Sequence, residues 1–358
     1  MNPTKTVLLI YGGKSVEHEI SIRSAKNVYE NIDKNLFKVV LAGIDKTGLW
    51  YLHQTVSTDI SQGIPIAPLP VSVVPEIMNL ADHSRIRYDI VFPVLHGTDG
   101  EDGAVQGIFK AFNVPLVGCS VLGSAVAMDK IVSKKLLKES GVPVADYFYF
   151  TSGEKDAFSF EKIVEKIGLP FMVKAGALGS SVGISKVSSI EEYETALRDS
   201  FLYGNQVLVE QFVKGRELEC GVIGNEHPEA TLPGEIILKK NYDFYNYQAK
   251  YQDEDAIDIV IPADTSEKIA KEIQKCCVMA YQALNCNDYA RVDLFLTDDN
   301  KIIINEINTI PGFTNVSMFP MLWKNMGLVY GDLITKLLQM AWKRWESQNA
   351  FQTSYDKA

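Results

Sequence analysis

The sequence predicts an α/β protein that begins with the opening unit of a doubly wound parallel sheet. A buried strand pattern at residues 5–11, the pair Gly12-Gly13 and a helical pattern from 17 to 31 give the strand, turn and helix of that unit. Further along, the small-residue loop 175–183 joins two strands, which indicates a hairpin flap. A chain of 358 residues is long enough for two or three domains at roughly 150 residues each.

Composition limits the classes of function. A net charge of −10 without a basic cluster argues against nucleic acid as the main partner. The five cysteines form no CxxC pair, which favours reduced thiols, and Cys276-Cys277 lies in a helical pattern that suits core packing. We see neither a signal peptide nor an apolar run of membrane-spanning length, so we expect a cytoplasmic protein without a membrane partner.

Two nucleotide-binding motifs are nearly matched after the first strand. Gly13-Lys14-Ser15 is similar to the end of a P-loop, but Leu8 stands where that motif needs glycine, and GxGxxG is absent. Glu17 and Glu19, near the start of the helix, could simply complement the helix dipole. The opening unit alone therefore does not identify a nucleotide site.

The next segments alternate between irregular and regular patterns. Residues 37–44 predict a second strand, and the proline-rich stretch 52–86 predicts an irregular surface excursion. Residues 88–95 predict a third strand that runs into the polar, glycine-rich loop 96–103. Loops at the carboxyl ends of parallel strands bind ligands in open α/β sheets, although a structural turn would explain this one as well.

The middle of the chain predicts a helix at 124–140, ended by Gly141 and Pro143, and then strands at 169–174 and 184–187. A lone helical lysine such as Lys130 is usually solvated. The backbone N–H groups of the loop between the two strands could cradle phosphate with Lys174 beside them, or the loop could be an ordinary hairpin connection.

Later segments predict a strand at 206–213, a ligand-covering loop at 241–251, and helices at 265–284 and 330–346. Between these helices, residues 289–317 form a predicted hairpin. Spacings of two place Arg291 and Asp293 on one face of its first strand, and Glu306 and Asn308 on one face of its second. Two carboxylates and an amide oxygen suit Mg²⁺, and a sheet edge kept soluble by inward charges is the alternative.

Taken together, these residues resemble ATP-grasp enzymes and, more specifically, the D-alanine–D-alanine ligase family. The resemblance rests on separated stretches that follow the family's order: GGKSVEHE at 12–19, the loop 96–103, GSSVG at 179–183, YQAKY at 247–251 and NEINTIPGFT at 305–314. It departs from the family at Ala175, which replaces the proline that commonly follows the flap lysine.

The resemblance implies a three-domain architecture: a Rossmann-like domain at 1–122, a central domain with the glycine flap at 123–213, and a third domain with the metal residues at 214–346. The last two domains would enclose ATP, and residues 347–358 would form a disordered tail. A homodimer is also implied.

The resemblance further implies a set of site residues and cofactors. ATP would contact Lys130, Lys174, Ser180, Glu210, Phe212, Val213, Glu217, Phe244, Lys250 and Asn305. Two Mg²⁺ or Mn²⁺ ions would be held by Asp293, Glu306 and Asn308, with K⁺ as an activator. D-Alanine would contact Glu17, His96, Arg291, Gly312, Ser317 and Met318. The catalytic residues would be Glu17, Ser180, Tyr251, Arg291 and Gly312.

The implied activity is ATP-dependent ligation of two D-alanine molecules through an acyl phosphate, for peptidoglycan precursors. Within the same class, D-serine or D-lactate could be the second substrate, although Tyr251 favours the dipeptide because the ester-forming relatives lack a tyrosine there. A nucleotide-binding regulator on the same scaffold and a dinucleotide-dependent oxidoreductase are the alternatives from other classes.

Overall fold

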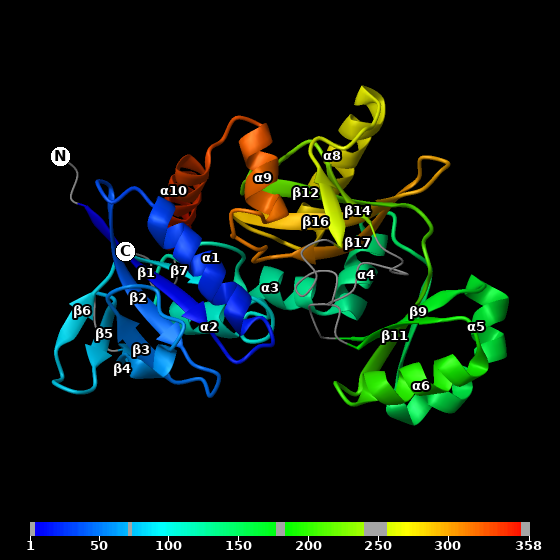
Figure 1. The fold of residues 1–358 in the computed structure, drawn as a ribbon, viewed down its shortest axis with the longest axis horizontal. Coiled ribbons are helices and arrows are strands. Elements are labelled where there is room, and N and C mark those ends of the chain that lie inside the picture. Colours follow the sequence, from blue (N-terminus) through cyan, green and yellow to red (C-terminus); the bar gives the residue numbers. More distant parts are fainter. Residues whose placement is uncertain (1–3, 71–73, 177–182, 240–255, 352–358) are drawn as a thin grey trace.

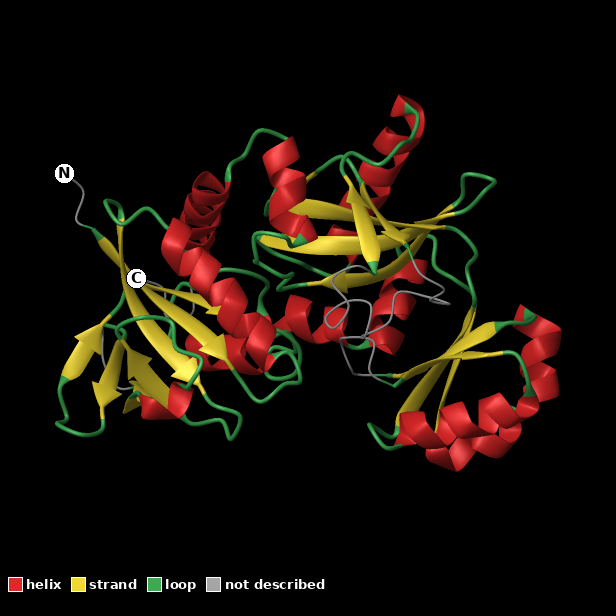
Figure 2. Cartoon of the chain, in the orientation of Figure 1, coloured by secondary structure: helices red, strands yellow, loops and turns green. Residues whose placement is uncertain are grey.

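The computed structural model describes residues 4–70, 74–176, 183–239 and 256–351. Three β-sheets organise this part of the chain, one in each lobe of the molecule (Figure 1). Helices flank each sheet, as the colouring by secondary structure makes clear (Figure 2). The prediction of a mixed α/β protein with a parallel opening unit is therefore confirmed.

The first sheet has a parallel centre and an antiparallel extension. Strand β1 pairs in parallel with β2 on one side and with β7 on the other, while the remaining pairs are antiparallel. In spatial order the strands are β6 (Arg85–Arg87), β5 (Glu76–Asn79), β4 (Ile64–Leu69), β3 (Trp50–His53), β2 (Phe37–Ile44), β1 (Lys5–Gly12) and β7 (Ile90–Val94).

The irregular excursion expected at 52–86 was wrong, because this stretch adds strands β4, β5 and β6 to the sheet and a 3₁₀ helix, η1 (Ile60–Gln62). The prediction took the prolines of this stretch as breaks in regular structure. Strand β4 pairs with β3 at Ile64 and Pro65 and with β5 at 66–69. Each half of β4 therefore pairs on one side, as an edge strand does, and an edge tolerates a residue that cannot donate a hydrogen bond.

The second sheet lies in the lobe labelled with β9, β11, α5 and α6 (Figure 1). Its strands are wholly antiparallel, and the pairing of β9 with β10 shows that the glycine loop does connect a hairpin. Its elements are β8 (Tyr147–Thr151), the 3₁₀ helix η2 (Ser152–Ala157), α5 (Phe160–Ile167), β9 (Phe171–Ala175), β10 (Ile184–Val187), α6 (Ile190–Phe201) and β11 (Gln206–Gln211).

The third sheet lies in the central lobe and is also antiparallel. Helix α8 packs on one face, where Cys276 and Cys277 join the core as expected, and α9 packs on the other. The elements are β12 (Arg216–Ile223), β13 (Glu229–Ala230), β14 (Gly234–Leu238), β15 (Ile257–Val260), α8 (Glu267–Ala283), β16 (Tyr289–Leu296), β17 (Ile302–Asn308) and α9 (Met318–Asn325).

Three further helices link the first lobe to the central one: α2 (Ala104–Ala111), α3 (Val121–Met128) and α4 (Lys130–Glu139). The single helix expected at 124–140 was wrong, because Asp129 leaves the helical conformation between α3 and α4. Its carboxylate accepts hydrogen bonds from the N–H groups of Ile131 and Val132, both at 2.9 Å. Asp129 is therefore an N-cap, and Lys130 is the first residue of α4.

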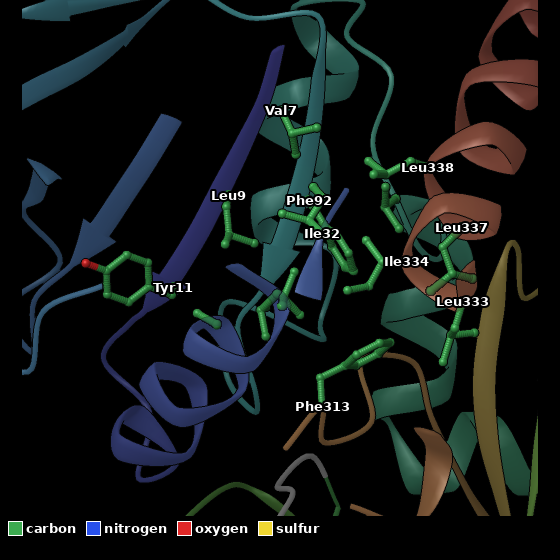
Figure 3. Close-up of a cluster of buried hydrophobic side chains, with 14 of the residues drawn as sticks. Val7, Leu9, Tyr11, Ile32, Phe92, Phe313, Leu333, Ile334, Leu337 and Leu338 are labelled. Carbon is green, nitrogen blue, oxygen red and sulfur yellow. The ribbon is translucent and has the colours of Figure 1, made fainter. Parts of the chain in front are cut away.

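Helix α10 (Tyr330–Asn349) returns from the central lobe and covers the first sheet. Leu333, Leu337 and Leu338 are buried, as their spacing predicted. Their side chains share one hydrophobic cluster with residues of β1, α1 (His18–Asn31) and β7, and Phe313 lies within the same cluster (Figure 3). The core of the first lobe is thus built from both ends of the chain.

Within the described ranges, helices are either too short or too polar to cross a membrane.

Candidate active site

Two adjoining cavities flank the third sheet. The large cavity, of about 730 Å³, lies where residues of the first lobe face the third sheet and α9. The small cavity, of about 240 Å³, lies between the second and third sheets. Glu219, Ile236 and Glu306 line both cavities, so the two spaces share a wall.

The predicted hairpin of β16 and β17 forms much of this shared wall. In its antiparallel register Arg291 pairs with Asn308 and Asp293 pairs with Glu306, with a bulge after Asp293. Directly paired residues project from the same face of a sheet. The structure therefore brings together the four polar residues that the two-residue spacing predicted.

Arg291 and Asp293 form a two-pronged ion pair. The Nε and Nη2 atoms of Arg291 donate to the two carboxylate oxygens of Asp293, each at 2.7 Å. The Nε atom also lies 2.9 Å from Glu219 Oε2, and Asn308 Nδ2 donates to Asp293 at 2.9 Å. The guanidinium of Arg291 is thus oriented by acidic residues of both β12 and β16.

The oxygen atoms on this hairpin fit a hard divalent cation. Asp293 and Glu306 supply carboxylates and Asn308 supplies an amide oxygen, the ligand types that Mg²⁺ and Mn²⁺ prefer. In the part of the chain that the structure describes, no group of three or more His, Cys, Asp or Glu side chains could hold a metal by itself. Mg²⁺ in proteins usually keeps water or phosphate oxygens among its ligands, which suits a set of only three side chains.

Glu210 is a buried acid of the small cavity that is paired with two lysines. Its side chain is 4% exposed and forms ion pairs with Lys134, at 2.7 Å, and with Lys174. Burial alone would favour the neutral acid, but the two ammonium groups lower the pKa of Glu210 to about 2. Lys174 also lies 3.4 Å from the amide oxygen of Asn305, and Phe212, Val213 and Glu217 line the same cavity.

Lys130 lies at the start of α4 and lines the large cavity. Its Nζ is 3.7 Å from Glu306 Oε2, so it is not the solvated lysine that its helical position allowed. Lys134 is not among the residues that the motifs predicted. It follows Lys130 by four residues on the same helix, and this spacing was the available signal for a shared face.

The first lobe contributes buried polar residues to the large cavity. Glu17, at the start of α1, and His96, after β7, are 7% and 4% exposed. Glu101 also lines the cavity, and no motif predicted it, although it lies inside the loop 96–103. Burial and the nearby Glu17 raise the pKa of Glu101 to about 8, and burial lowers the pKa of His96.

The other end of the large cavity is formed by the segment before α9. Gly312 lines the cavity, and a side chain there would meet Ser317 Oγ, since an added Cβ would lie 2.8 Å from that atom. Ser317 is the N-cap residue of α9 and Met318 is the first residue of the helix. The amino end of a helix presents N–H groups that suit a carboxylate.

Some predicted site residues lie outside the described residues. These are Ser180 in the glycine flap and Phe244, Lys250 and Tyr251 in the predicted covering loop.

The three sheets, with the two joined cavities beside the third, are the α/β architecture of an ATP-grasp enzyme. Family models for the amino-terminal and carboxyl-terminal domains of D-Ala–D-Ala ligases match residues 6–119 and 136–339. The chain is 44% identical to D-alanine–D-alanine ligase A of Escherichia coli K12, over 97% of this chain and 98% of that protein. It is 43% identical to a D-alanine–D-alanine ligase of Shouchella clausii, over 98% of each chain.

Solved structures agree with these matches. The D-alanine–D-alanine ligase of Coxiella burnetii superposes with a TM-score of 0.86 at 34% identity, covering 97% of this chain and 96% of that one. The VanG D-Ala:D-Ser ligase of Enterococcus faecalis gives 0.85 at 34% identity, covering 94% and 99%. The chain belongs to the D-alanine–D-alanine ligase family, as its motifs suggested. Membership implies the use of ATP and a divalent metal ion.

Proposed function

We propose that this protein joins two D-alanine molecules into D-alanyl-D-alanine for peptidoglycan precursor synthesis, with ATP converted to ADP and phosphate. The observation that carries the proposal is the shared wall of the two cavities. Arg291, which lines the large cavity, and Glu306, which lines both, lie on one hairpin, so a phosphate acceptor and ATP can meet there. Unaided, a carboxylate and an amine do not condense, and phosphorylation supplies the missing leaving group.

In the first half-reaction, a carboxylate oxygen of the first D-alanine attacks the γ-phosphorus of ATP and ADP leaves. Lys130, Lys174 and Lys250 bind the phosphates, and Asn305 orients Lys174. Glu210, Phe212 and Val213 contact the adenine, with Phe244 beside the ring, and Glu217 holds the ribose. The support for this arrangement is the small cavity, where Lys174, Glu210 and Glu217 lie together.

Asp293, Glu306 and Asn308 would hold two Mg²⁺ or Mn²⁺ ions. Bound there, these ions would share the negative charge of the transferring phosphoryl group. The hard-oxygen chemistry of the three side chains supports the assignment.

In the second half-reaction, the amine of the second D-alanine attacks the acyl phosphate and phosphate leaves. The negative charge that develops on the carbonyl oxygen is stabilised by Arg291 and by the N–H of Gly312. Glu17 pairs with the ammonium of the first D-alanine. Ser317 and the N–H of Met318 bind the carboxylate of the second, at the amino end of α9.

Water must be kept out of the site, because it would hydrolyse the acyl phosphate. In this proposal Glu17 would form a hydrogen-bonded trio with Ser180 and Tyr251, which would close the flap and exclude water from the acyl phosphate.

Phosphate release from ATP, Mg²⁺ and D-alanine, followed together with dipeptide formation, tests the proposed reaction. Turnover with another amino acid but none with D-alanine would refute the proposed substrate.

D-Serine as the second substrate is the alternative, because the chain is also similar to a D-Ala:D-Ser ligase over nearly its full length. D-Lactate is a weaker alternative, since Tyr251 favours an amine acceptor. Competition among D-alanine, D-serine and D-lactate at fixed pH decides between them.

We also propose that the protein works in the cytoplasm as a homodimer activated by K⁺. Light scattering tests the dimer, and replacing K⁺ by Na⁺ in the assay tests the activation.

A further inference from the structure

The segment that carries Gly312 is held by three side chains of the first lobe. These are Ser24 on α1, and His96 and Glu101 in the loop after β7. We propose that Ser24, His96 and Glu101 form a clamp that positions the N–H of Gly312 in the large cavity. Its effect on catalysis rests on the function proposed above, in which that N–H stabilises the developing charge.

The clamp binds both backbone polar groups of Ile310, its N–H and its carbonyl oxygen. The N–H of Ile310 donates to Glu101 Oε1 at 3.0 Å, and its carbonyl oxygen lies 2.9 Å from His96 Nδ1. The second oxygen of Glu101 accepts from the N–H of Gly97 at 2.8 Å. Glu101 therefore ties the loop after β7 to the segment after β17.

The contacts of His96 fix which ring nitrogen carries hydrogen. A carbonyl oxygen can only accept, so Nδ1 is the donor to Ile310. The neutral ring then accepts at Nε2 from the hydroxyl of Ser24, which lies 3.0 Å away. Because both nitrogens are engaged, His96 acts here as a positioning residue. The family resemblance instead places it near a substrate carboxylate.

Ser24 closes the clamp at the far side of Gly312. While its hydroxyl hydrogen points to His96, its oxygen accepts from the N–H of Phe313 at 3.2 Å. The ring of Phe313 is fully buried among aromatic rings, 6.0 Å from Phe92 and 5.6 Å from Phe319 between ring centres. Figure 3 shows Phe313 beside the side chains of α10.

Among residues 310–313, the N–H of Gly312 is the one backbone donor without a hydrogen-bond acceptor in the described part of the chain. Pro311 has none, and those of Ile310 and Phe313 are taken. Among the described residues, none accepts a hydrogen bond from Gly312. The 310–311 and 312–313 peptide units, which flank the unit that carries the Gly312 N–H, are thus held while that N–H remains available at the cavity wall.

Ser24→Ala tests the clamp, with Ser21→Ala as its matched control. Ser21 also lies on α1 and is also fully buried, and its hydroxyl bonds Gly12 and Val94 within the first lobe. Both changes remove a buried hydroxyl, and Ser24→Ala alone removes a contact to residues 310–313.

Ser24→Ala should lower kcat about tenfold to a hundredfold, the scale of effect when a reacting geometry is misplaced. The KM for D-alanine should stay unchanged, and less dipeptide should form for each ATP consumed. Ser21→Ala should leave kcat and this ratio unchanged. An equal fall of kcat in both variants, or a raised KM at normal kcat in Ser24→Ala, would overturn the clamp.

A second variant and a second readout keep the test independent of folding and of the proposed function. Glu101→Gln retains one accepting oxygen. Like Ser24→Ala, it should lower kcat and leave the KM for D-alanine unchanged. Hydrogen exchange should become faster at Phe313, whose N–H loses its acceptor, and at Ile310 in Ser24→Ala but not in Ser21→Ala, whichever substrates the enzyme takes. Unchanged exchange would refute the clamp, whereas wild-type protein that forms no dipeptide would refute only the proposed function.

Discussion

Lys134 holds one oxygen of Glu210 while Lys174 holds the other. In the proposed complex Lys174 turns to the phosphates, and Lys134 remains to keep Glu210 ionised. Lys134→Met should raise the KM for ATP and lower the free energy of unfolding by roughly 2 kcal/mol, the typical contribution of a charged hydrogen bond. Kinetics and urea unfolding measure both effects. Lys138→Met changes an exposed lysine of the same helix, and an equal effect there would contradict the prediction.

Glu306 lines both cavities, and its loss should affect catalysis more than folding. Glu306→Gln removes a negative charge from the predicted metal ligands. We expect kcat to fall more than about a hundredfold, as when a charge-stabilising group is lost, and Mn²⁺ to bind more weakly in calorimetry. Asp299→Asn is the control, since it removes an exposed carboxylate from the turn of the same hairpin. Near-normal turnover of Glu306→Gln would refute the metal assignment.

Glu101 predicts a pH dependence of stability. Its pKa is raised from 4.5 to about 8, first by burial and then by Glu17. Between these values the folded chain binds more protons than the unfolded chain, so the free energy of unfolding falls as pH rises through this window. Glu101→Gln should show a shallower fall. Urea unfolding at several pH values isolates this effect, because His96 is present in both proteins, and identical slopes would contradict the prediction.

The break between α3 and α4 depends on the cap at Asp129. Asp129→Ala should lower the free energy of unfolding by about 1 kcal/mol, because two N–H groups lose their acceptor. It should also raise the KM for ATP, since Lys130 follows the cap and its N–H donates to Gly176 O at the start of the flap, at 3.0 Å. Asp129→Ser keeps an N-cap side chain, so its free energy of unfolding and its KM for ATP should be close to those of the wild type. A Ser variant as impaired as the Ala variant would show that capping is not the cause.

The sequence predicted those elements in which buried and exposed residues alternate at the spacing of a strand or a helix. The alternation along 289–308 correctly placed Arg291, Asp293, Glu306 and Asn308 on one face, and the leucines of α10 were correctly predicted to be buried. Strand β4 was missed because of its prolines. They are tolerated because each half of β4 pairs with a neighbour on one side only, and this pairing cannot be read from the local sequence.

The site residues that the motifs did not predict have a common cause. Glu101 and Lys134 acquire their roles from partners distant in sequence, Ile310 and Glu210. A motif identifies residues by type and spacing, and it cannot show which side chains a fold will bring against them. For this reason the family resemblance implies the reaction, whereas the clamp is recognised only in the folded chain.

At the scale of the molecule, Arg344 of α10 joins two lobes. It donates to both oxygens of the fully buried Asp288 in the central lobe and to the carbonyls of Leu116 and Gly118 in the first. Arg344→Met should lower the free energy of unfolding by about 3–5 kcal/mol, because it leaves a buried carboxylate without its cation.

Arg344→Lys keeps the charge but cannot reproduce the planar set of donors. The free energy of unfolding of this variant should therefore lie between those of the wild type and Arg344→Met. Urea unfolding measures both variants. A Met variant as stable as the wild type would contradict the proposed link between the lobes.

The packing of α10 on the first sheet also bears on how the protein is made. Until α10 has been translated, the side chains of β1 and β7 pack against α1 but lack the leucines of α10 as neighbours. The first lobe to be synthesised is therefore among the last to be completed, and a nascent chain halted before residue 330 exposes that apolar face. Chaperones that hold exposed apolar surface would therefore bind the side chains of β1 and β7 before α10 has been translated.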